Sequence, residues 1–281
     1  MAIVITEAEK RLLQSVNLPP RPQTLLTVSA EAKKAEPDVA VVAAAIAADV
    51  SISAAVLQVV NSAAYRRARE IESIQQAVMT LGFKRLFPLV RAVALKSTLT
   101  SNQSLDDFWF YNEHVAAASV LVAERVGRTQ IKDFAYMLGL FQSAGIPLML
   151  NAFPDYYDLF LQAEHTPWPQ ILQAEREQFD TTHTTVGAML AQRWQLPKVI
   201  IEVIYFLHDD DSLFSAGELA SLGLDLFAIV RTARAIVDQR LRSEAGSQEW
   251  QQVVDGVLSH FHLDDVYLEE AMAEIADDVF A

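Results

Sequence analysis

The stretch that decides the fold is residues 49–86, which read DVSISAAVLQVVNSAAYRRAREIESIQQAVMTLGFKRL. Apolar residues recur at positions 52, 56, 59 and 60, and again at 74, 78 and 81, with the spacing of one helix face. Ser73 and Gln76 match a capping box, and Gly82 follows as a helix stop. These signals predict two short helices around a polar corner of Asn61, Ser62 and Tyr65, and taken alone they favour a helical hairpin with a hydrogen-bonded turn.

The same stretch resembles the signature of the HDOD family, the HD-related output domain. The resemblance rests on the helix at 49–57, the Asn61-Ser62…Tyr65 corner, Ile71-x-Ser73-Ile74…Ala77, Leu81-Gly82-x-Lys84-Arg85-Leu86 and the preceding Leu18-Pro19-Pro20-x-Pro22. A weaker resemblance continues to about His208. The resemblance to the HDOD family implies an all-helical fold similar to that of the HD phosphohydrolases and a regulatory role in signalling. HDOD domains usually lack the metal ligands of those enzymes.

Composition limits the possible classes of protein. The chain has 281 residues, of which 52% are hydrophobic, so an ample globular core is expected. It contains no cysteine, which excludes disulfides, thiolate zinc sites and a cysteine nucleophile. The first residues do not match a secretory signal, and no uninterrupted apolar run of membrane-spanning length occurs. We therefore expect a cytoplasmic protein with no membrane partner.

The net charge of −14 is unevenly distributed. Residues 1–199 hold 18 Lys and Arg against 19 Asp and Glu, whereas residues 200–281 hold 4 against 17. An acidic balance argues against nucleic-acid binding, which needs clustered cations. Residues 66–96 are locally basic, with the cations Arg66, Arg67, Arg69, Lys84, Arg85, Arg91 and Lys96. We interpret them either as a solvated helix face or as a surface that docks an acidic partner, an anion or the protein's own acidic C-terminal part.

Helical periodicity and punctuation predict an all-α, irregular multi-helix bundle of HD-like architecture. No segment alternates with the period of a strand. The polar run 101–107 separates an N-terminal lobe, residues 1–103, from an HD-like lobe, residues 104–210, and residues 211–281 form an acidic helical extension. Residues 4–16 have the pattern of an amphipathic helix, and Pro88 either kinks a helix within 83–99 or begins a new one.

The HD phosphohydrolases hold a catalytic cation with histidine and aspartate side chains, including an adjacent His-Asp pair. The run that aligns with that pair reads Leu140-Phe141-Gln142-Ser143-Ala144-Gly145, so an amide and a hydroxyl replace it. The resemblance also places His114, His183 and His208 near this position. Each histidine is either an ordinary hydrogen-bonded helix residue or a member of one vestigial pocket: His114, Gln142, Ser143, His183 and His208.

His208 also begins a His-Asp-Asp-Asp run, residues 208–211, which we interpret as an acidic surface loop with at most weak affinity for a hard cation. Other catalytic templates are missing, since the chain has no Gly-x-Ser-x-Gly elbow, no Walker loop and no Gly-x-Gly-x-x-Gly. We therefore expect no cofactor, no bound metal and no phosphohydrolase activity.

Three hypotheses for function follow. The first is a non-catalytic HDOD-type module that binds a protein partner in a bacterial signalling pathway. The second is a metal-dependent phosphohydrolase with a rearranged site built from His114, His183, His208 and Asp209. The third is a sensor that binds a second-messenger nucleotide near Arg66, Arg67 and Arg69. The sequence leaves the partner and the oligomeric state open.

Overall fold

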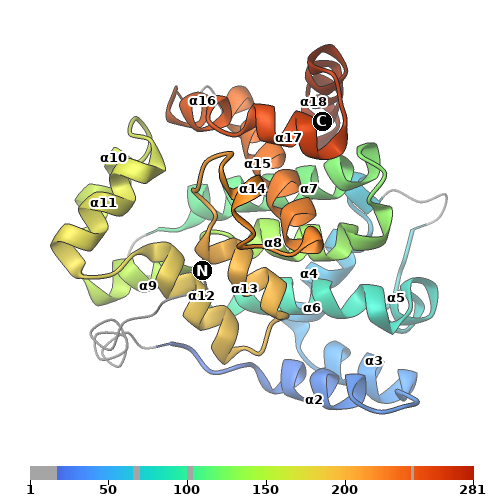
Figure 1. The fold of residues 1–281 in the computed structure, drawn as a ribbon. Coiled ribbons are helices and arrows are strands. Elements are labelled where there is room, and N and C mark those ends of the chain that lie inside the picture. The colour runs from blue at the N-terminus through green and yellow to red at the C-terminus, as the bar shows by residue number, and fades with distance from the viewer. Residues whose placement is uncertain (1–17, 66–69, 100–103, 242–243) are drawn as a thin grey trace.

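The computed structural model describes residues 18–65, 70–99, 104–241 and 244–281, so the predicted helix at 4–16 lies outside the described residues. The predicted all-α class is confirmed, because the described ranges contain helices and no strand (Figure 1). The helices are α2 (Gln23–Ala32), α3 (Val39–Ala47), α4 (Val50–Val60), η1 (Ala63–Tyr65), α5 (Ile74–Leu81), α6 (Phe83–Thr98), α7 (Asp106–Arg125), η2 (Thr129–Ile131), α8 (Lys132–Phe141), α9 (Gly145–Ala152), α10 (Tyr156–Gln162), α11 (Trp168–Phe179), α12 (His183–Arg193), α13 (Lys198–Tyr205), α14 (Leu213–Ala216), α15 (Ser221–Leu241), α16 (Glu244–Gln251), α17 (Val254–Phe261) and α18 (Asp265–Phe280).

Helix α5 begins and ends at the residues that the sequence predicts. Ser73 Oγ accepts a hydrogen bond from the backbone N of Gln76 at 3.1 Å, and the Gln76 side chain accepts one from the backbone N of Glu72. Gly82 has φ +74°, the left-handed conformation that glycine adopts most easily, and it ends α5. Pro88 lies inside α6, which continues through it, so the proline does not start a new helix.

The two lobes share one hydrophobic core. Buried apolar residues from α2 to α18 form a single cluster. Helix α6 of the N-terminal lobe packs on α8, and α8 packs along α7 at the centre of the molecule (Figure 1). The close approach of α7 and α8 depends on Gly139, where a Cβ would lie 2.7 Å from Cα of Ala116. The N-terminal lobe is therefore continuous with the HD-like lobe.

The acidic extension is also built into this core through α15. That helix packs on α7, α8 and α13, and its residues 226–238 are buried. Two arginines and an aspartate, Arg231, Arg234 and Asp238, are buried on it among apolar neighbours. The division of the chain after residue 210 remains a prediction, and α15 of the extension packs on helices of the HD-like lobe.

The described cations of residues 84–96 do not pair with the acidic extension. Arg85 Nε donates to Asp133 at 2.9 Å, Lys96 pairs with Glu113, and Arg91 donates to the Gln195 carbonyl. The extension pairs instead with the end of α7, where Arg125 binds Glu274 and Arg128 binds Asp225. Arg66, Arg67 and Arg69 lie outside the described residues.

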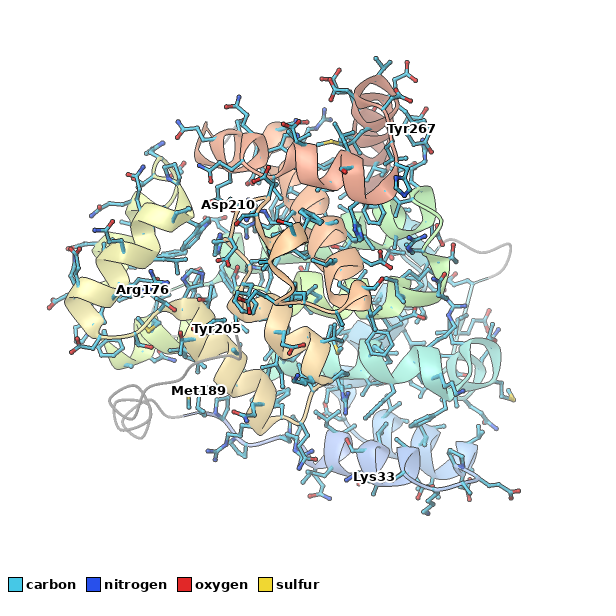
Figure 2. All side chains as sticks on the ribbon, in the orientation of Figure 1. Lys33, Arg176, Met189, Tyr205, Asp210 and Tyr267 are labelled. Atoms are coloured by element: carbon cyan, nitrogen blue, oxygen red, sulfur yellow. The ribbon has the colours of Figure 1, made fainter. Side chains whose placement is uncertain are left out.

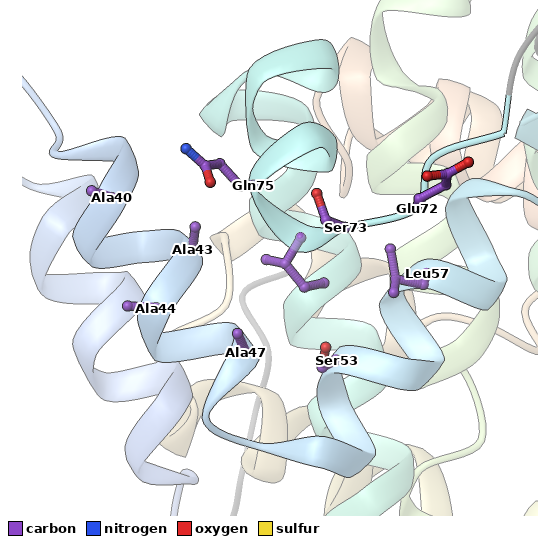
Figure 3. Close-up of a pocket in the computed structure, with 10 residues that line it drawn as sticks. Ala40, Ala43, Ala44, Ala47, Ser53, Leu57, Glu72, Ser73 and Gln75 are labelled. Atoms are coloured by element: carbon purple, nitrogen blue, oxygen red, sulfur yellow. The ribbon is translucent and has the colours of Figure 1, made fainter.

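No helix of the described chain meets, by itself, the length and hydropathy that a membrane crossing requires. Helices α3 and α4 pass that test only as a pair bent by 110°. They border a surface groove of about 490 Å³ (Figure 3), which is lined by Ala40, Ala43, Ala44, Ala47, Ser53, Leu57, Glu72, Ser73, Ile74 and Gln75.

Candidate functional site

Two buried histidines face each other at the centre of the HD-like lobe. His183 is the first residue of α12, because Thr182 caps that helix by accepting a hydrogen bond from the Thr185 backbone N at 3.1 Å. His208 follows the end of α13. Their Nε2 atoms are 3.3 Å apart, within hydrogen-bonding distance. The structure therefore brings together two of the histidines that the sequence assigns to one pocket.

A carboxylate lies behind each imidazole ring. Nδ1 of His183 is 2.9 Å from Oε1 of Glu175, which also accepts a hydrogen bond from the Tyr156 hydroxyl at 2.6 Å. Nδ1 of His208 is 3.4 Å from Oε2 of Glu249 on α16. Nδ1 of each ring therefore faces a carboxylate oxygen, while the two Nε2 atoms face each other.

The indole of Trp168 covers both imidazoles. Its ring centroid lies 4.6 Å from that of His183 and 5.1 Å from that of His208. The backbone N of Trp168, at the start of α11, donates to Oε1 of Glu249 at 2.7 Å. Glu249 therefore satisfies one of the amides that the first turn of a helix leaves without an intrahelical partner.

Arginines of α15 connect the histidine pair to Gln142. Arg234 Nη1 donates to Gln142 Oε1 at 2.9 Å, and its Nη2 lies 3.6 Å from Oε2 of Glu249. Gln142 Nε2 in turn donates to Asn112 Oδ1 on α7 at 3.3 Å. Arg231 donates to the Leu207 carbonyl at 2.7 Å, just before His208. A continuous polar network thus runs from α7 through α8, α15 and α16 to the histidines.

Burial and charge set the protonation of this network. Burial lowers the pKa of His208 well below its ordinary value, although Glu249 opposes the shift, so the imidazole is neutral. Burial alone would raise the pKa of Glu249, but the positive charges around it, which Arg234 and Arg231 supply when His208 is neutral, lower the pKa below the ordinary value. Burial also raises the pKa of Asp238, beside Arg234, to about 6. Glu249 is the fixed anion of the site.

Two glycines let the helices that carry the site approach each other. A Cβ on Gly145, at the start of α9, would lie 2.8 Å from the backbone N of Gly187 on α12. A Cβ on Gly187 would lie 3.2 Å from the side chain of Ile204 on α13. Ser143 is buried two residues before α9, and its carbonyl accepts a hydrogen bond from the backbone N of Ile146. The motifs around Gln142 and His183 therefore meet at their glycines.

His114 does not join this network. Its Nδ1 lies 2.6 Å from the Phe110 carbonyl of the preceding turn, and its half-exposed ring stacks on Phe280 of α18 at 4.6 Å between centroids. Asn112, two residues earlier on α7, makes the contact with Gln142 instead, because residues two apart on a helix face different sides. The placement of His114 in a shared pocket is therefore corrected.

Sequence reasoning did not identify most of the partners of the histidines. The burial of Arg231 and Arg234 could have been predicted, since they are two cations three residues apart in an otherwise apolar helical run. The sequence gives no sign that Glu175 and Glu249 are buried, because each is one acidic residue among many in polar helices. The contact of Glu249 with His208 joins residues 41 apart.

The signature corner holds the N-terminal lobe together. The Asn61 side chain exchanges two hydrogen bonds with the backbone of Ile71, both 2.9 Å long. Ser62 Oγ donates to the Val59 carbonyl. Tyr65 is buried, and burial together with Asp133 raises the pKa of its hydroxyl well above the ordinary value. Of the predicted partner or anion surface, Lys84 is exposed and Arg85 is bound to Asp133.

The acidic run after His208 lies at the surface. Asp210, labelled in Figure 2, is on the loop between α13 and α14 and accepts a hydrogen bond from the backbone N of Ser212 at 2.9 Å. Burial and the neighbouring Asp210 raise the pKa of Asp209. The Asp209 carbonyl accepts a hydrogen bond from Arg231, which fixes the start of the loop.

The residues present do not fit the catalytic metal of an HD phosphohydrolase. Gln142 and Ser143 replace the His-Asp pair, and Gln142 Oε1 already accepts a hydrogen bond from the permanently charged Arg234. Within the described ranges, no three His, Cys, Asp or Glu side chains are grouped so as to hold a metal ion. A guanidinium at this position repels a divalent cation and leaves Gln142 unavailable to one.

The order of these motifs along the chain agrees with a known family. The sequence pattern of the HDOD domain matches residues 18–210, which is more than half of the chain. The chain belongs to the HDOD family. The match ends before α15 and α16, so Arg231, Arg234 and Glu249 of the polar network lie beyond it.

A curated relative and several solved structures resemble this HDOD protein. A protein of Treponema pallidum without assigned function is 26% identical over 253 residues, which cover 88% of this chain and 46% of the relative. The chain thus spans about half the length of the curated relative it matches.

The solved structures show the same fold. An HDOD domain protein of unknown function from Geobacter sulfurreducens has a TM-score of 0.70 and 23% identity, and the match covers 97% of this chain and 98% of the other. A candidate phosphohydrolase from Shewanella amazonensis has a TM-score of 0.67 and 24% identity, with 95% and 97% covered. A candidate signal transduction protein from Marinobacter aquaeolei has a TM-score of 0.69 and 19% identity, and the match covers 99% of this chain and 61% of the other.

Proposed function

We propose that this chain is a non-catalytic HDOD regulatory module, which acts through protein–protein contacts in a cytoplasmic signalling pathway. The observation that carries the proposal is the hydrogen bond from Arg234 to Gln142. In an HD phosphohydrolase, the aligned position would help to hold the cation that activates water. Here a permanent positive charge is tied to that position, and its own counter-ion is the buried Glu249.

A role in signalling is supported by the family and by one of its structural relatives. The protein of Marinobacter aquaeolei with the same fold is a candidate signal transduction protein. His183 and His208 are buried inside this lobe, so recognition of a partner would fall to the surface. Affinity purification from the native cell with mass spectrometry of bound proteins tests this part, and the absence of any reproducible partner would count against it.

The absence of catalysis is tested by enzyme assays. Phosphomonoesters, nucleotides and cyclic dinucleotides are offered to the purified protein with manganese, iron or magnesium, and we expect no turnover and no stoichiometric metal. His183→Ala removes a residue of the network, and His114→Ala is the matched control outside it. Turnover that disappears in His183→Ala and persists in His114→Ala would show a working enzyme.

One observation favours the rearranged phosphohydrolase as a second candidate. The Nε2 atoms of His183 and His208 face each other with a carboxylate behind each ring, which is how metal-binding histidines are commonly held. Catalytic zinc sites use three protein ligands, and neither His114 nor Asp209 contacts this pair in the hydrogen bonds of the described chain. Calorimetric titration with zinc separates the candidates, since tight 1:1 binding that His208→Ala abolishes would favour the enzyme.

The nucleotide-sensor hypothesis concerns Arg66, Arg67 and Arg69, which lie outside the described residues. It is tested by thermal shift against cyclic nucleotides. A shift that is lost when all three arginines are replaced by glutamine would favour it over the protein-binding module.

A further inference from the structure

Helix α16 is attached to the protein in an unusual way. Surface helices normally bury an apolar stripe. In α16, by contrast, the largest buried side chain among residues 246–251 is the carboxylate-bearing Glu249, which is 4% exposed, while Trp250 is only half-buried. The remaining side chains, Ser247, Gln248 and Gln251, are exposed. The seating of α16 therefore combines the insertion of Glu249 with the packing of Trp250 on the core and of Gly246 on Asp238.

That site has the composition of an oxyanion site. The Glu249 carboxylate meets the backbone N of Trp168 at 2.7 Å, His208 Nδ1 at 3.4 Å, and the guanidinium groups of Arg234 and Arg231 at 3.6 and 4.0 Å. Both arginines are buried, with 3% and 4% of their surface exposed. A helix N-terminus combined with arginines is a common arrangement for binding carboxylate or phosphate groups.

Each member of this cradle also has a partner other than the Glu249 carboxylate, and Arg231 Nη2 additionally donates to the Glu249 backbone carbonyl at 3.0 Å. Arg231 is bonded to the carbonyl of Leu207, and Arg234 is bonded to Gln142. His208 is bonded to His183, and the Trp168 amide belongs to α11. Asp238, whose pKa is raised to about 6, is the other carboxyl group close to Arg234. Withdrawal of α16 would leave two oriented cations and an amide around a vacancy of carboxylate size.

We infer that the cradle of His208, Arg231, Arg234 and the Trp168 amide is a binding site for a small oxyanion, closed in this structure by the protein's own Glu249. The ligand class is a molecule or protein segment that presents a carboxylate or phosphate group. Such a ligand binds by replacing Glu249 and displacing α16. The inference goes beyond the proposed function and does not depend on it, since a module with or without catalysis could carry such a site.

The first experiment creates the vacancy. Glu249→Ala is expected to lower Tm by on the order of 5–10 °C, because two buried cations lose their counter-ion. Formate, acetate and inorganic phosphate are then added separately at about 100 mM, each against sodium chloride of equal ionic strength. A ligand present at about ten times its Kd should raise Tm by about 3 °C. Formate and acetate report a carboxylate site, and phosphate reports a phosphate site.

Two variants serve as controls. Glu249→Gln keeps the size of the side chain without its charge, so the vacancy is filled and formate should have no specific effect. Glu274→Ala removes a carboxylate of the same extension that pairs with Arg125 at the surface, and neither its Tm nor its response to formate should differ from the wild type. If chloride and all three oxyanions act equally on Glu249→Ala, the cradle is not an oxyanion site and the inference is overturned.

The second experiment uses the wild-type protein and decides the matter even if Glu249→Ala does not fold. Hydrogen–deuterium exchange of the segment 244–251 is followed with phosphate and with chloride at equal ionic strength. We expect phosphate to increase exchange in this segment about threefold or more while exchange in α7 stays unchanged. Unchanged exchange in 244–251 would overturn the displacement of α16.

Discussion

Gly145 and His183 approach so closely that a Cβ on Gly145 would lie 1.9 Å from the carbonyl oxygen of His183. This contact joins the start of α9 to the first turn of α12 and so sets the depth at which the His183 ring enters the lobe. Any residue with a Cβ at position 145 would force the backbone of α9 or of α12 to move, so only glycine fits. The position of the histidine pair therefore depends on the absence of a Cβ at position 145.

Gly145→Ala should destabilise the protein by about 3 kcal/mol, because the clash is with backbone that cannot turn aside. The loss is measured from urea unfolding followed by circular dichroism. Gly217→Ala is the matched control: its φ is +73° but nothing lies within 4 Å of the added Cβ, so it should cost only about 1 kcal/mol. Equal losses in the two variants would show that α9 and α12 are not in close contact.

Arg234→Met should cost about 3–5 kcal/mol of stability, because the buried Glu249 loses a counter-ion and Gln142 loses its donor. Arg240→Met on the same helix is the control. Its pairing with Asp277 is 4.0 Å long and exposed, so its loss should change stability by less than about 0.5 kcal/mol. The free energies of unfolding of both variants at pH 7 check this, and a similar value for the two would mean that Arg234 is not buried in an ionic network.

Asp238 should make the protein lose stability as pH rises through the mildly acidic range. Burial raises its pKa from 3.8 to about 6, so between these values the folded state binds the proton more tightly than the unfolded state. Stability from this group is full below pH 4 and declines until about pH 6, by about 3 kcal/mol in total. Unfolding of the wild type and of Asp238→Asn is measured from pH 4 to 7. The wild type should fall relative to the variant, and parallel curves would contradict the prediction.

Glu249 should give the pH dependence of stability the opposite sign to that of Asp238. Its pKa is held far below the ordinary value of 4.5, so the stability it contributes is present above pH 4.5 and is lost as the pH falls toward the folded pKa. The pH dependence of Glu249→Gln should therefore lack the wild-type loss of stability below pH 4.5. Unfolding of the wild type and of Glu249→Gln is therefore measured in a titration that extends below pH 4, and parallel curves there would contradict the prediction.

Asn61→Ala should cost about 1–2 kcal/mol, because it removes both hydrogen bonds that hold residue 61 to Ile71. Ser62→Ala removes one local bond to the Val59 carbonyl and should cost less than about 1 kcal/mol. Chemical unfolding of the two variants is the measurement. If Ser62→Ala proves the more damaging, the corner is held by the turn of α4 and not by the clamp between Asn61 and Ile71.

The sequence by itself determined the local structure. The helix cap at Ser73, the helix stop at Gly82 and the replacement of the His-Asp pair by Gln142 and Ser143 can all be recognised within a few residues, because capping and backbone conformation are local effects. The family follows from the same short motifs in order. His183 and His208 could be expected to meet, since the motif around each carries a resemblance of its own.

Only the tertiary structure decided what surrounds those histidines. Arg234 and Gln142 are 92 residues apart, and Trp168 and Glu249 are 81 apart, so no local pattern predicts either contact. His114 was wrongly assigned to the pocket. Residues two apart on α7 face different sides, and it is Asn112 that contacts Gln142. The sequence indicates an acidic helical extension, and the structure adds that its helices α15 and α16 complete the polar network around the histidines. Burial, and not sequence neighbourhood, determines which charges must meet, since an unpaired charge in the interior costs several kcal/mol.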